Sequence, residues 1–275
     1  QFAACRRAIE SAERAGRPDL ARHAMPPMMM AAYLGSMPLE EVAEMATQMI
    51  TGGNGRVEME GAAVWLGLAQ VLSGSTEEGL ANIERGFAEI RDLGLVIAVA
   101  GSTALEADAY TAMGDLASAA GRLRAGAATL RDAGELGILS FVAGYLSVVL
   151  AEMGELNEAE EAAAESRTTA TADDIASQLA WRAGLAVVRA RQGAHTEAEP
   201  LAREAVELAG RTDSPAFQAM TSSALAVVLA AEGRVDEARA AQLEAIQLNE
   251  RKGNLAMASR LRREGAVDTA QPSWA

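Results

Sequence analysis

The residues that could carry out acid–base or nucleophilic chemistry are few and lie far apart in this chain. It has two histidines, His23 and His195, one cysteine, Cys5, and one lysine, Lys252. A catalytic centre needs several polar groups that converge in space and tune one another's pKa values. No histidine lies near Cys5 in the sequence, so we interpret its thiol as inert. The inventory predicts no enzyme, no catalytic residues and no cofactor.

Two glycine-containing stretches are weak candidates for phosphate or anion binding. Lys252 lies in RKGN, which lacks the upstream glycine spacing of a phosphate-binding loop. The stretch TGGNG, Thr51–Gly55, precedes a predicted helix whose N-terminus could bind an anion. We favour the interpretation of Thr51–Gly55 as a flexible loop between helices.

A methionine-rich stretch is the most unusual local feature. Eight of the 12 methionines lie in residues 25–59. Their thioethers, together with His23, could bind Cu(I), and methionine also forms adaptable binding surfaces. Because Met28-Met29-Met30 directly follow Pro26-Pro27, the stretch has no ligand-like spacing. We predict no metal site and favour core filling over a binding surface.

The elements that must position these residues are repeated along the chain. A glycine recurs before an acidic, alanine-containing signature, as in GELNEAE, at steps of 40, 40, 39 and 40 residues. These period glycines are Gly74, Gly114, Gly154, Gly193 and Gly233. Gly35 lies 39 residues before Gly74, although the text after it is offset by about three residues. A fixed period in this range predicts a solenoid.

Each period divides into two predicted helices, an apolar one before the glycine and a more charged one after it. The predicted first helices are Ala62–Ser73, Val96–Met113, Ile138–Met153, Asp174–Gln192 and Pro215–Glu232. The predicted second helices are Thr76–Leu93, Leu116–Ala133, Asn157–Thr168, Thr196–Arg211 and Asp236–Lys252. Glycine can adopt the left-handed conformation that ends a helix, and the acids after it complement the next helix N-terminus. Two more helices are expected at Phe2–Ala15 and Leu255–Arg263, the second a basic cap on the last repeat.

Small residues mark the places where helices are expected to cross closely. Alanine is the fifth residue after the period glycine in four units, at Ala119, Ala159, Ala198 and Ala238, and Gly79 holds the place in an earlier unit. Seven residues before the glycine stand Gly67, Ala107, Ser147, Ala186 and Ala226. Small residues let two helices approach each other.

This pattern resembles the tetratricopeptide repeat. The shared features are a Leu-small pair, a bulky residue three positions later (Tyr110, Leu150, Leu229), the glycine, and alanine five residues on. Gln70 and Arg189 depart from the bulky position, and the period of ~40 exceeds the usual 34. The resemblance covers about residues 20–265. It implies an all-α fold, a right-handed α-solenoid of about six to seven antiparallel helix pairs.

Long-period arrays of this kind are similar to the C-terminal repeat modules of large bacterial signalling ATPases and transcriptional regulators. The closing text EGRVDEARAAQLEAIQLNERKGNLAMASRLR is similar to the end of such an array. We expect one solenoid domain over residues 1–265 and a disordered tail at 266–275. Whether this domain is a fragment of a longer protein stays open.

Charge and composition narrow the classes of partner. The net charge of −14 argues against nucleic acid as a direct partner. Residues 61–180 carry 18 acidic and 6 basic residues. This acidic segment could bind a basic ligand, but we favour the interpretation as a solvated face. The single cysteine fits a reducing cytoplasm. The longest apolar run, residues 136–151, has 16 residues against the ~20 of a membrane helix, so we expect a buried helix and no membrane partner.

The resemblance implies that the first helix of each pair lines an extended concave face. Candidate positions lie ten, six and two residues before the period glycines. The binding residues expected there are Val64, Leu68, Asp108, Val148, Glu152, Val187, Arg191 and Val227. Such a largely apolar groove suits an amphipathic helix or an extended peptide, with a small-molecule effector as a second class of ligand. Trp65 and Trp181 are expected to pack between repeats, and a place in the groove is the alternative.

Three functions stay open at this point. The favoured one is a non-catalytic protein- or ligand-binding module, the sensor or interaction domain of a larger bacterial regulator. The second is a stand-alone adaptor that binds one partner protein. The third is an enzyme with its site around Asp108 and Glu152, which the shortage of catalytic groups disfavours.

Overall fold

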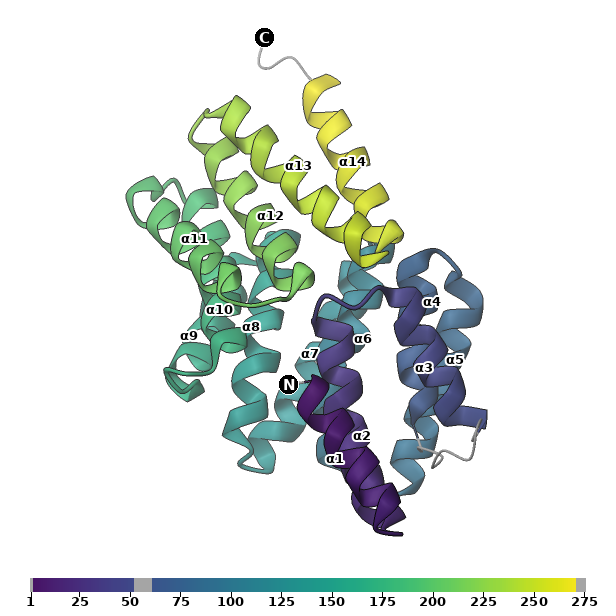
Figure 1. Ribbon diagram of the computed structural model, residues 1–275. Coiled ribbons are helices and arrows are strands. Elements are labelled where there is room, and N and C mark those ends of the chain that lie inside the picture. Colours follow the sequence, from purple (N-terminus) through teal and green to yellow (C-terminus); the bar gives the residue numbers. More distant parts are fainter. Residues whose placement is uncertain (1, 52–60, 271–275) are drawn as a thin grey trace. The chain divides into compact units, whose positions relative to one another are not determined.

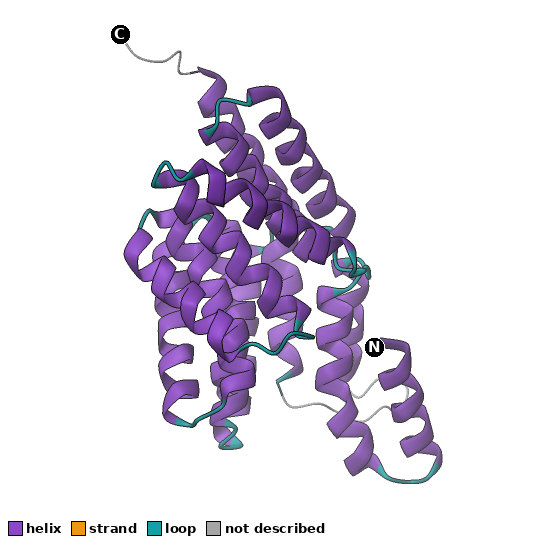
Figure 2. Cartoon of the chain, turned by 90° about the vertical axis from the view of Figure 1, so that its left-hand side faces the viewer, coloured by secondary structure: helices purple, strands orange, loops and turns teal. Residues whose placement is uncertain are grey.

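The computed structural model of the chain describes residues 2–51 and 61–270, and these residues form helices joined by short turns (Figure 2). Over this part of the chain there are fourteen helices and no strand. Alanine, leucine, glutamate and arginine, which dominate the sequence, lose little side-chain freedom in a helix. The all-α prediction is confirmed, and so is the stacking of consecutive helices in adjacent pairs.

The chain forms two compact units, which are described separately. Unit 1 comprises residues 1–96 together with Lys252–Asn254. Its helices are α1 (Phe2–Arg14), α2 (Pro18–Leu34), α3 (Leu39–Thr51), α4 (Ala62–Ser73) and α5 (Thr76–Asp92). Helices α1 and α2 form a hairpin, and α4 packs against both α3 and α5 (Figure 1).

Unit 2 comprises residues 97–251 and 255–275. Its helices are α6 (Val96–Met113), α7 (Leu116–Asp132), α8 (Leu136–Met153), α9 (Leu156–Thr169), α10 (Ile175–Arg191), α11 (His195–Gly210), α12 (Pro215–Ala231), α13 (Val235–Lys252) and α14 (Leu255–Ala270). The first helices α8, α10 and α12 stack in that order, and α9 and α11 pack against them as their second helices (Figure 1).

The period glycines form the tight turns that were expected of them. Gly74, Gly114, Gly154, Gly193 and Gly233 have φ angles of 107°, 85°, 85°, 78° and 76°. A residue with a Cβ is strained in this left-handed region, so glycine ends each first helix. Gly35 is different, because its φ of −78° and ψ of −165° are extended.

Lys252 stabilises the turn at Gly35 in place of the left-handed motif. This lysine is 4% exposed, and its Nζ donates hydrogen bonds to the carbonyl oxygens of Ala32 at 3.0 Å, Gly35 at 2.7 Å and Met37 at 2.6 Å. The last carbonyls of a helix have no partner within the helix. The ammonium group therefore satisfies the end of α2 and complements its partial negative charge.

The small residues lie where helices cross, as predicted. In unit 1, a Cβ on Gly67 would come within 2.4 Å of the Gly79 carbonyl oxygen. In unit 2, a Cβ on Gly184 of α10 would lie 2.1 Å from Ser147 Oγ of α8. Backbones at this distance leave no room for a side chain, which explains the glycine at each place.

Two predictions about apolar segments are borne out by burial. Met25, Met28, Met29 and Met49 are at most 6% exposed and fill the core, whereas Met30, Met37 and Met45 are half-buried. Helix α8 is long and apolar enough to cross a membrane, but 61% of its residues in that window are buried inside the protein. Its packing against α7, α9 and α10 is that of a core helix. The stretch 52–55 of the glycine-rich candidate Thr51–Gly55 lies outside the described residues.

The C-terminal helix is longer than the expected Leu255–Arg263. Helix α14 continues to Ala270, so residues 266–270 of the expected tail are helical. Gly265 lies inside it, where a Cβ would come within 2.8 Å of the Gln242 side chain on α13. This glycine therefore permits a close crossing and does not end the helix.

Candidate functional site

The predicted concave positions of unit 2 lie on the stack of first helices. Asp108 on α6 and Val148 on α8 are half-buried, Val187 on α10 is 8% exposed and Val227 on α12 is 39% exposed. Exposure is thus lowest at Val187 on α10 and highest at Val227 on α12. Among the apolar residues predicted for this face, Val227 is the most exposed.

Val64 and Leu68, predicted for the same groove, belong to the core of unit 1. They are 3% and 0% exposed. Val64 packs closely on α5, since a Cβ on Gly86 would lie 2.5 Å from the Val64 backbone nitrogen. Helix α4 is enclosed by its neighbours, so these two side chains present no surface to a ligand.

The residue rows ten positions before the glycines also face inward. Ala104, Gly144 and Ala183 are buried. A Cβ on Gly144 would lie 2.9 Å from the Ala180 Cβ of α10 and 3.1 Å from the Ser166 Oγ of α9. These positions therefore form contacts between helices. The exposed residues of the face belong to the two other rows, which lie six and two residues before the period glycines.

Charged groups gather at the C-terminal ends of the first helices. The Glu152 carboxylate on α8 forms an ion pair with the Arg260 guanidinium of α14. Nη1 of Arg260 also donates a 2.6 Å hydrogen bond to the Thr111 carbonyl oxygen near the end of α6. Arg191, at the end of α10, is exposed, and its Nη1 lies 3.5 Å from where a Cβ of Gly154 would be. The Glu152 carboxylate and the Arg191 guanidinium thus both lie near the C-terminal end of α8.

An aromatic pair on α8 lies beside Asp108. The rings of Phe141 and Tyr145 are 4.7 Å apart between centroids and tilted by 49°. Burial of the Tyr145 hydroxyl, followed by the negative charge of Asp108, raises the pKa of Tyr145 well above its usual 10.0. The phenol is therefore neutral at physiological pH, and it packs as a core side chain with a polar tip.

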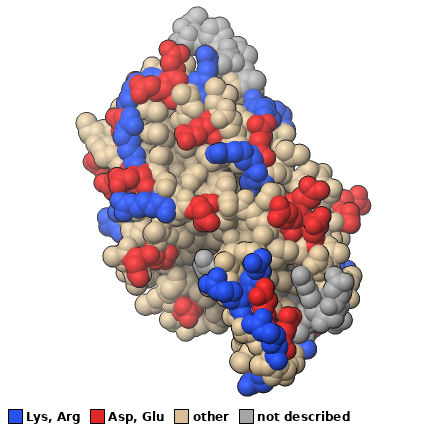
Figure 3. Space-filling view, in the orientation of Figure 1, with Lys and Arg blue, Asp and Glu red and all other residues tan. Residues whose placement is uncertain are grey.

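Arginine–glutamate pairs join successive repeats across the acidic middle of the chain. Figure 3 shows acidic and basic side chains interleaved on the visible face. Among the pairs that link different helices are Arg124 with Glu155 and Glu158, Arg131 with Glu165, Arg182 with Glu204, and Arg189 with Glu160. These contacts engage four of the 18 acidic residues of 61–180, namely Glu155, Glu158, Glu160 and Glu165, so the solvated face stays a prediction.

Both tryptophans on first helices pack between helices. Trp65 is 6% exposed and lies 5.9 Å from the Tyr33 ring. Trp181 is 7% exposed, with the Arg182 guanidinium carbon 4.1 Å from its ring centroid. Their burial agrees with a packing role.

The groups expected to be inert are placed as structural residues. His23 is exposed, and its Nδ1 lies 2.7 Å from the Asp19 carbonyl oxygen. His195 begins α11 in unit 2, whereas His23 belongs to unit 1. Cys5 is a half-buried free thiol. Over the described residues, no cluster of three or more His, Cys, Asp or Glu side chains could hold a metal ion.

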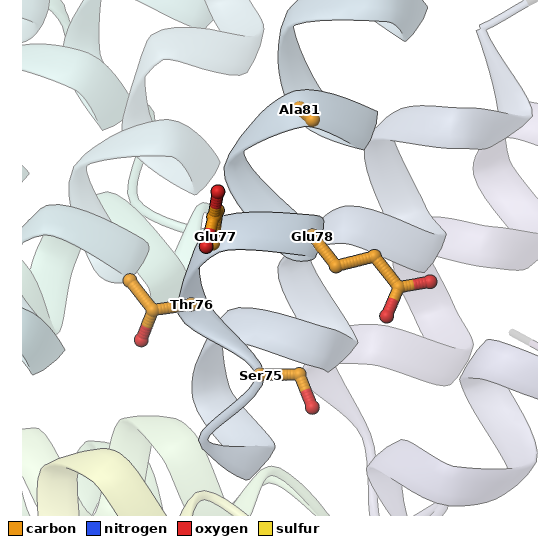
Figure 4. A pocket seen from close by; sticks show the side chains of 5 residues that line it. All are labelled: Ser75, Thr76, Glu77, Glu78 and Ala81. Carbon is orange, nitrogen blue, oxygen red and sulfur yellow. The ribbon is translucent and has the colours of Figure 1, made fainter.

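A hollow of about 530 Å³ lies at the start of α5, lined by Ser75, Thr76, Glu77, Glu78 and Ala81. Figure 4 shows that its polar side chains point in different directions and do not converge. Glu77 and Glu78 occupy the first turn of α5, where acids complement the helix N-terminus. The two carboxylates therefore stabilise the start of α5 by their charge and do not form a binding site.

The sequence did not indicate the part played by Arg260 and Thr111. Arg260 lies beyond the last period, so no repeat position drew attention to it, and Thr111 contributes only a backbone oxygen. The one available indication was the basic character of the predicted cap helix. It did not reveal which helices the cap would contact.

Comparison with known proteins defines the fold only. No family model matches the sequence, and no curated protein matches it. Among solved structures, the crystal structure of BtubC (BKLC) from P. vanneervenii has a similar fold, with a TM-score of 0.50 and 16% sequence identity over 86% of this chain and 92% of that chain. At this identity the likeness concerns the arrangement of helices and carries no function to this chain.

Proposed function

We propose that the chain is a non-catalytic binding module, which holds an amphipathic helix or an extended peptide on the face formed by α6, α8, α10 and α12. The observation that supports this is the row of residues six positions before the period glycines, in which Asp108 and Val148 are half-buried, Val187 is 8% exposed and Val227 is 39% exposed. Apolar side chains in a row, with charges at one end, match the anchors and flanking charges of a helical peptide.

Within this proposal, the module is the sensor or interaction domain of a larger bacterial regulatory protein in the cytoplasm. A stand-alone adaptor for one partner protein is the alternative. The mass of the native protein in its own cells distinguishes the two, by immunoblot. A band much heavier than 28.6 kDa supports the regulatory domain, and a band at that mass supports the adaptor.

The binding face is tested with peptides selected from a displayed library of helical sequences on the wild-type chain. Their affinities are then measured by fluorescence anisotropy for Val227→Glu and for a matched control, Val235→Glu. Both valines are exposed, at 39% and 59%, but Val235 begins α13, a second helix. A glutamate in place of Val227 removes the apolar anchor, and the bound peptide would bury its carboxylate away from water, which is costly.

We expect Val227→Glu to weaken binding by about tenfold or more, a loss of ~1.4 kcal/mol, and Val235→Glu to leave it unchanged. Equal affinity for both variants would show that the selected peptides bind elsewhere and would remove the support for this face.

A further inference from the structure

Helix α14 is held on the binding face of unit 2 by a buried arginine. Arg260 is 6% exposed, although arginine is normally found at the surface. All three of its guanidinium nitrogens are engaged: Nη1 with the Thr111 carbonyl oxygen at 2.6 Å, Nη2 with the Glu152 carboxylate, and Nε with Glu264 Oε1 at 2.8 Å.

This contact is not one that a linear array of repeats requires. In a solenoid each repeat mainly touches its neighbours. Arg260 and Thr111 are separated by 149 residues, and three complete helix pairs lie between α14 and α7 in the sequence. The last helix of unit 2, α14, therefore contacts the first helix of the unit, α6. It also contacts Glu152 of α8, which lies two residues before the period glycine Gly154.

Helix α14 is also attached to α12 and α13, in part by an ion pair between Arg262 and Glu250 of α13. Leu261 packs against Ala219, Ala245 and Leu248, and Gln242 Nε2 donates a 3.0 Å hydrogen bond to the Leu261 carbonyl oxygen. Arg262 and Arg263 are exposed, and Leu255 is 51% exposed. A buried ion pair gains little net stability, because the desolvation of both charges offsets their attraction. Removing one partner is nevertheless costly, because the charge that remains has lost its counter-charge, so the loss of Arg260 or of Glu152 is expected to loosen α14.

The chemistry of this contact is specific for a guanidinium group. A helix-end carbonyl and a carboxylate lie on different helices, and the planar fork of arginine reaches both at once. The partial negative charge at the C-terminal end of α6 favours a cation there. A lysine ammonium is a single point charge and does not span two such acceptors in the same way.

We propose that α14 is an intramolecular latch. Its Arg260 occupies an arginine site made by the Thr111 carbonyl and the Glu152 carboxylate, and a partner segment that presents an arginine displaces it. This inference rests on the proposed function, because it names the regulation and the partner chemistry of the same face. The fraction of molecules with α14 released sets the apparent affinity for such a partner.

The latch itself is tested by hydrogen–deuterium exchange of the full chain without any ligand. We compare the wild type with Arg260→Gln, with Glu152→Gln, and with the control Arg263→Gln on the exposed side of α14. Arg260→Gln and Glu152→Gln are expected to speed the exchange of α14 amides by about tenfold, with the other helices of unit 2 unchanged. Circular dichroism confirms that each variant is folded. If neither variant changes α14 exchange relative to Arg263→Gln, the latch is refuted.

The arginine site is tested by adding a labelled peptide with the sequence of α14, LAMASRLRREGAVDTA, to the same full-length chains. The Arg260→Gln chain is expected to bind it about tenfold more tightly than the wild type, since its own latch is open. The same peptide with Arg260→Gln is expected not to bind. If α14 is released but the unchanged peptide still fails to bind, the latch stands and the proposed binding function of this face fails.

Discussion

The close crossing of α8 and α10 makes a prediction that the structure specifies in detail. In Gly184→Ala, the new Cβ would lie 2.1 Å from Ser147 Oγ and 2.9 Å from both the Cβ and the carbonyl carbon of Ser147, whereas ordinary contact begins near 3.4 Å. The hydroxyl can rotate away, but the backbone carbon cannot. From 2.9 to 3.4 Å, the two helices must separate by about 0.5 Å.

The magnitude follows from two opposing terms. Overpacking a close-packed contact costs about 1–3 kcal/mol, while replacing glycine by alanine inside a helix gains about 1 kcal/mol. We therefore expect Gly184→Ala to lower the free energy of unfolding by about 0–2 kcal/mol, toward the upper end because the backbone carbon cannot move aside. The matched control is Gly121→Ala on α7, where nothing lies within 4 Å of the new Cβ. It should raise stability by about 0.5–1 kcal/mol.

Urea unfolding followed by circular dichroism measures both variants, and Ser147→Ala adds a third comparison. Ser147 Oγ is buried and has no hydrogen-bond partner in the structure. Its removal should gain about 1 kcal/mol and should recover only part of the loss in Gly184→Ala, because the backbone contact remains. A Gly184→Ala variant as stable as Gly121→Ala would refute the close contact of α8 with α10.

Two further predictions concern charged groups. Lys252→Met should lower the free energy of unfolding in urea by about 2–4 kcal/mol, because the carbonyls of Ala32, Gly35 and Met37 lose a charged donor. The control Arg263→Met, at an exposed site, should change it little. Equal effects of the two substitutions would contradict this prediction. Arg124 hydrogen-bonds Glu158 and holds the pKa of that carboxyl below its usual 4.5, so the pair stabilises the fold above that pH and the stability is lost as the pH falls through the lowered pKa. Thermal unfolding should show a smaller acid-induced decrease in Tm for Arg124→Gln than for wild type, and parallel curves would exclude a contribution from the pair.

Local signals in the sequence predicted the helices well. The expected bounds Ala62–Ser73 and Val96–Met113 coincide with α4 and α6. A glycine in the left-handed conformation, or an acid at the next helix start, acts within a few residues and can be found without knowledge of the rest of the fold. The helix beginning at Leu136 started two residues before the predicted Ile138, within the usual uncertainty of a helix end.

Glycines inside helices were harder to interpret. Gly265 lies two residues beyond the predicted end of the cap helix at Arg263, but it is inside α14, where it packs against Gln242 of α13. Gly144 was placed on the concave face by its repeat position, and it faces α9 and α10. A sequence cannot distinguish a glycine that ends a helix from one that admits a neighbouring helix, because the neighbour decides.

The same limit explains the outcome for the binding face. Repeat position predicted one row for Val148, Val187 and Val227, which lie on the stacked helices α8, α10 and α12, but exposure along that row depends on how each helix is covered by others. The path of the array accumulates from a small rotation at every repeat, and no single residue encodes that rotation. The contact of Arg260 with Thr111 depends on the sum over all the intervening pairs. The sequence of a repeat therefore determines how it packs on its neighbours. The contact of α14 with α6, which would govern access to the binding face, depends on the assembled unit.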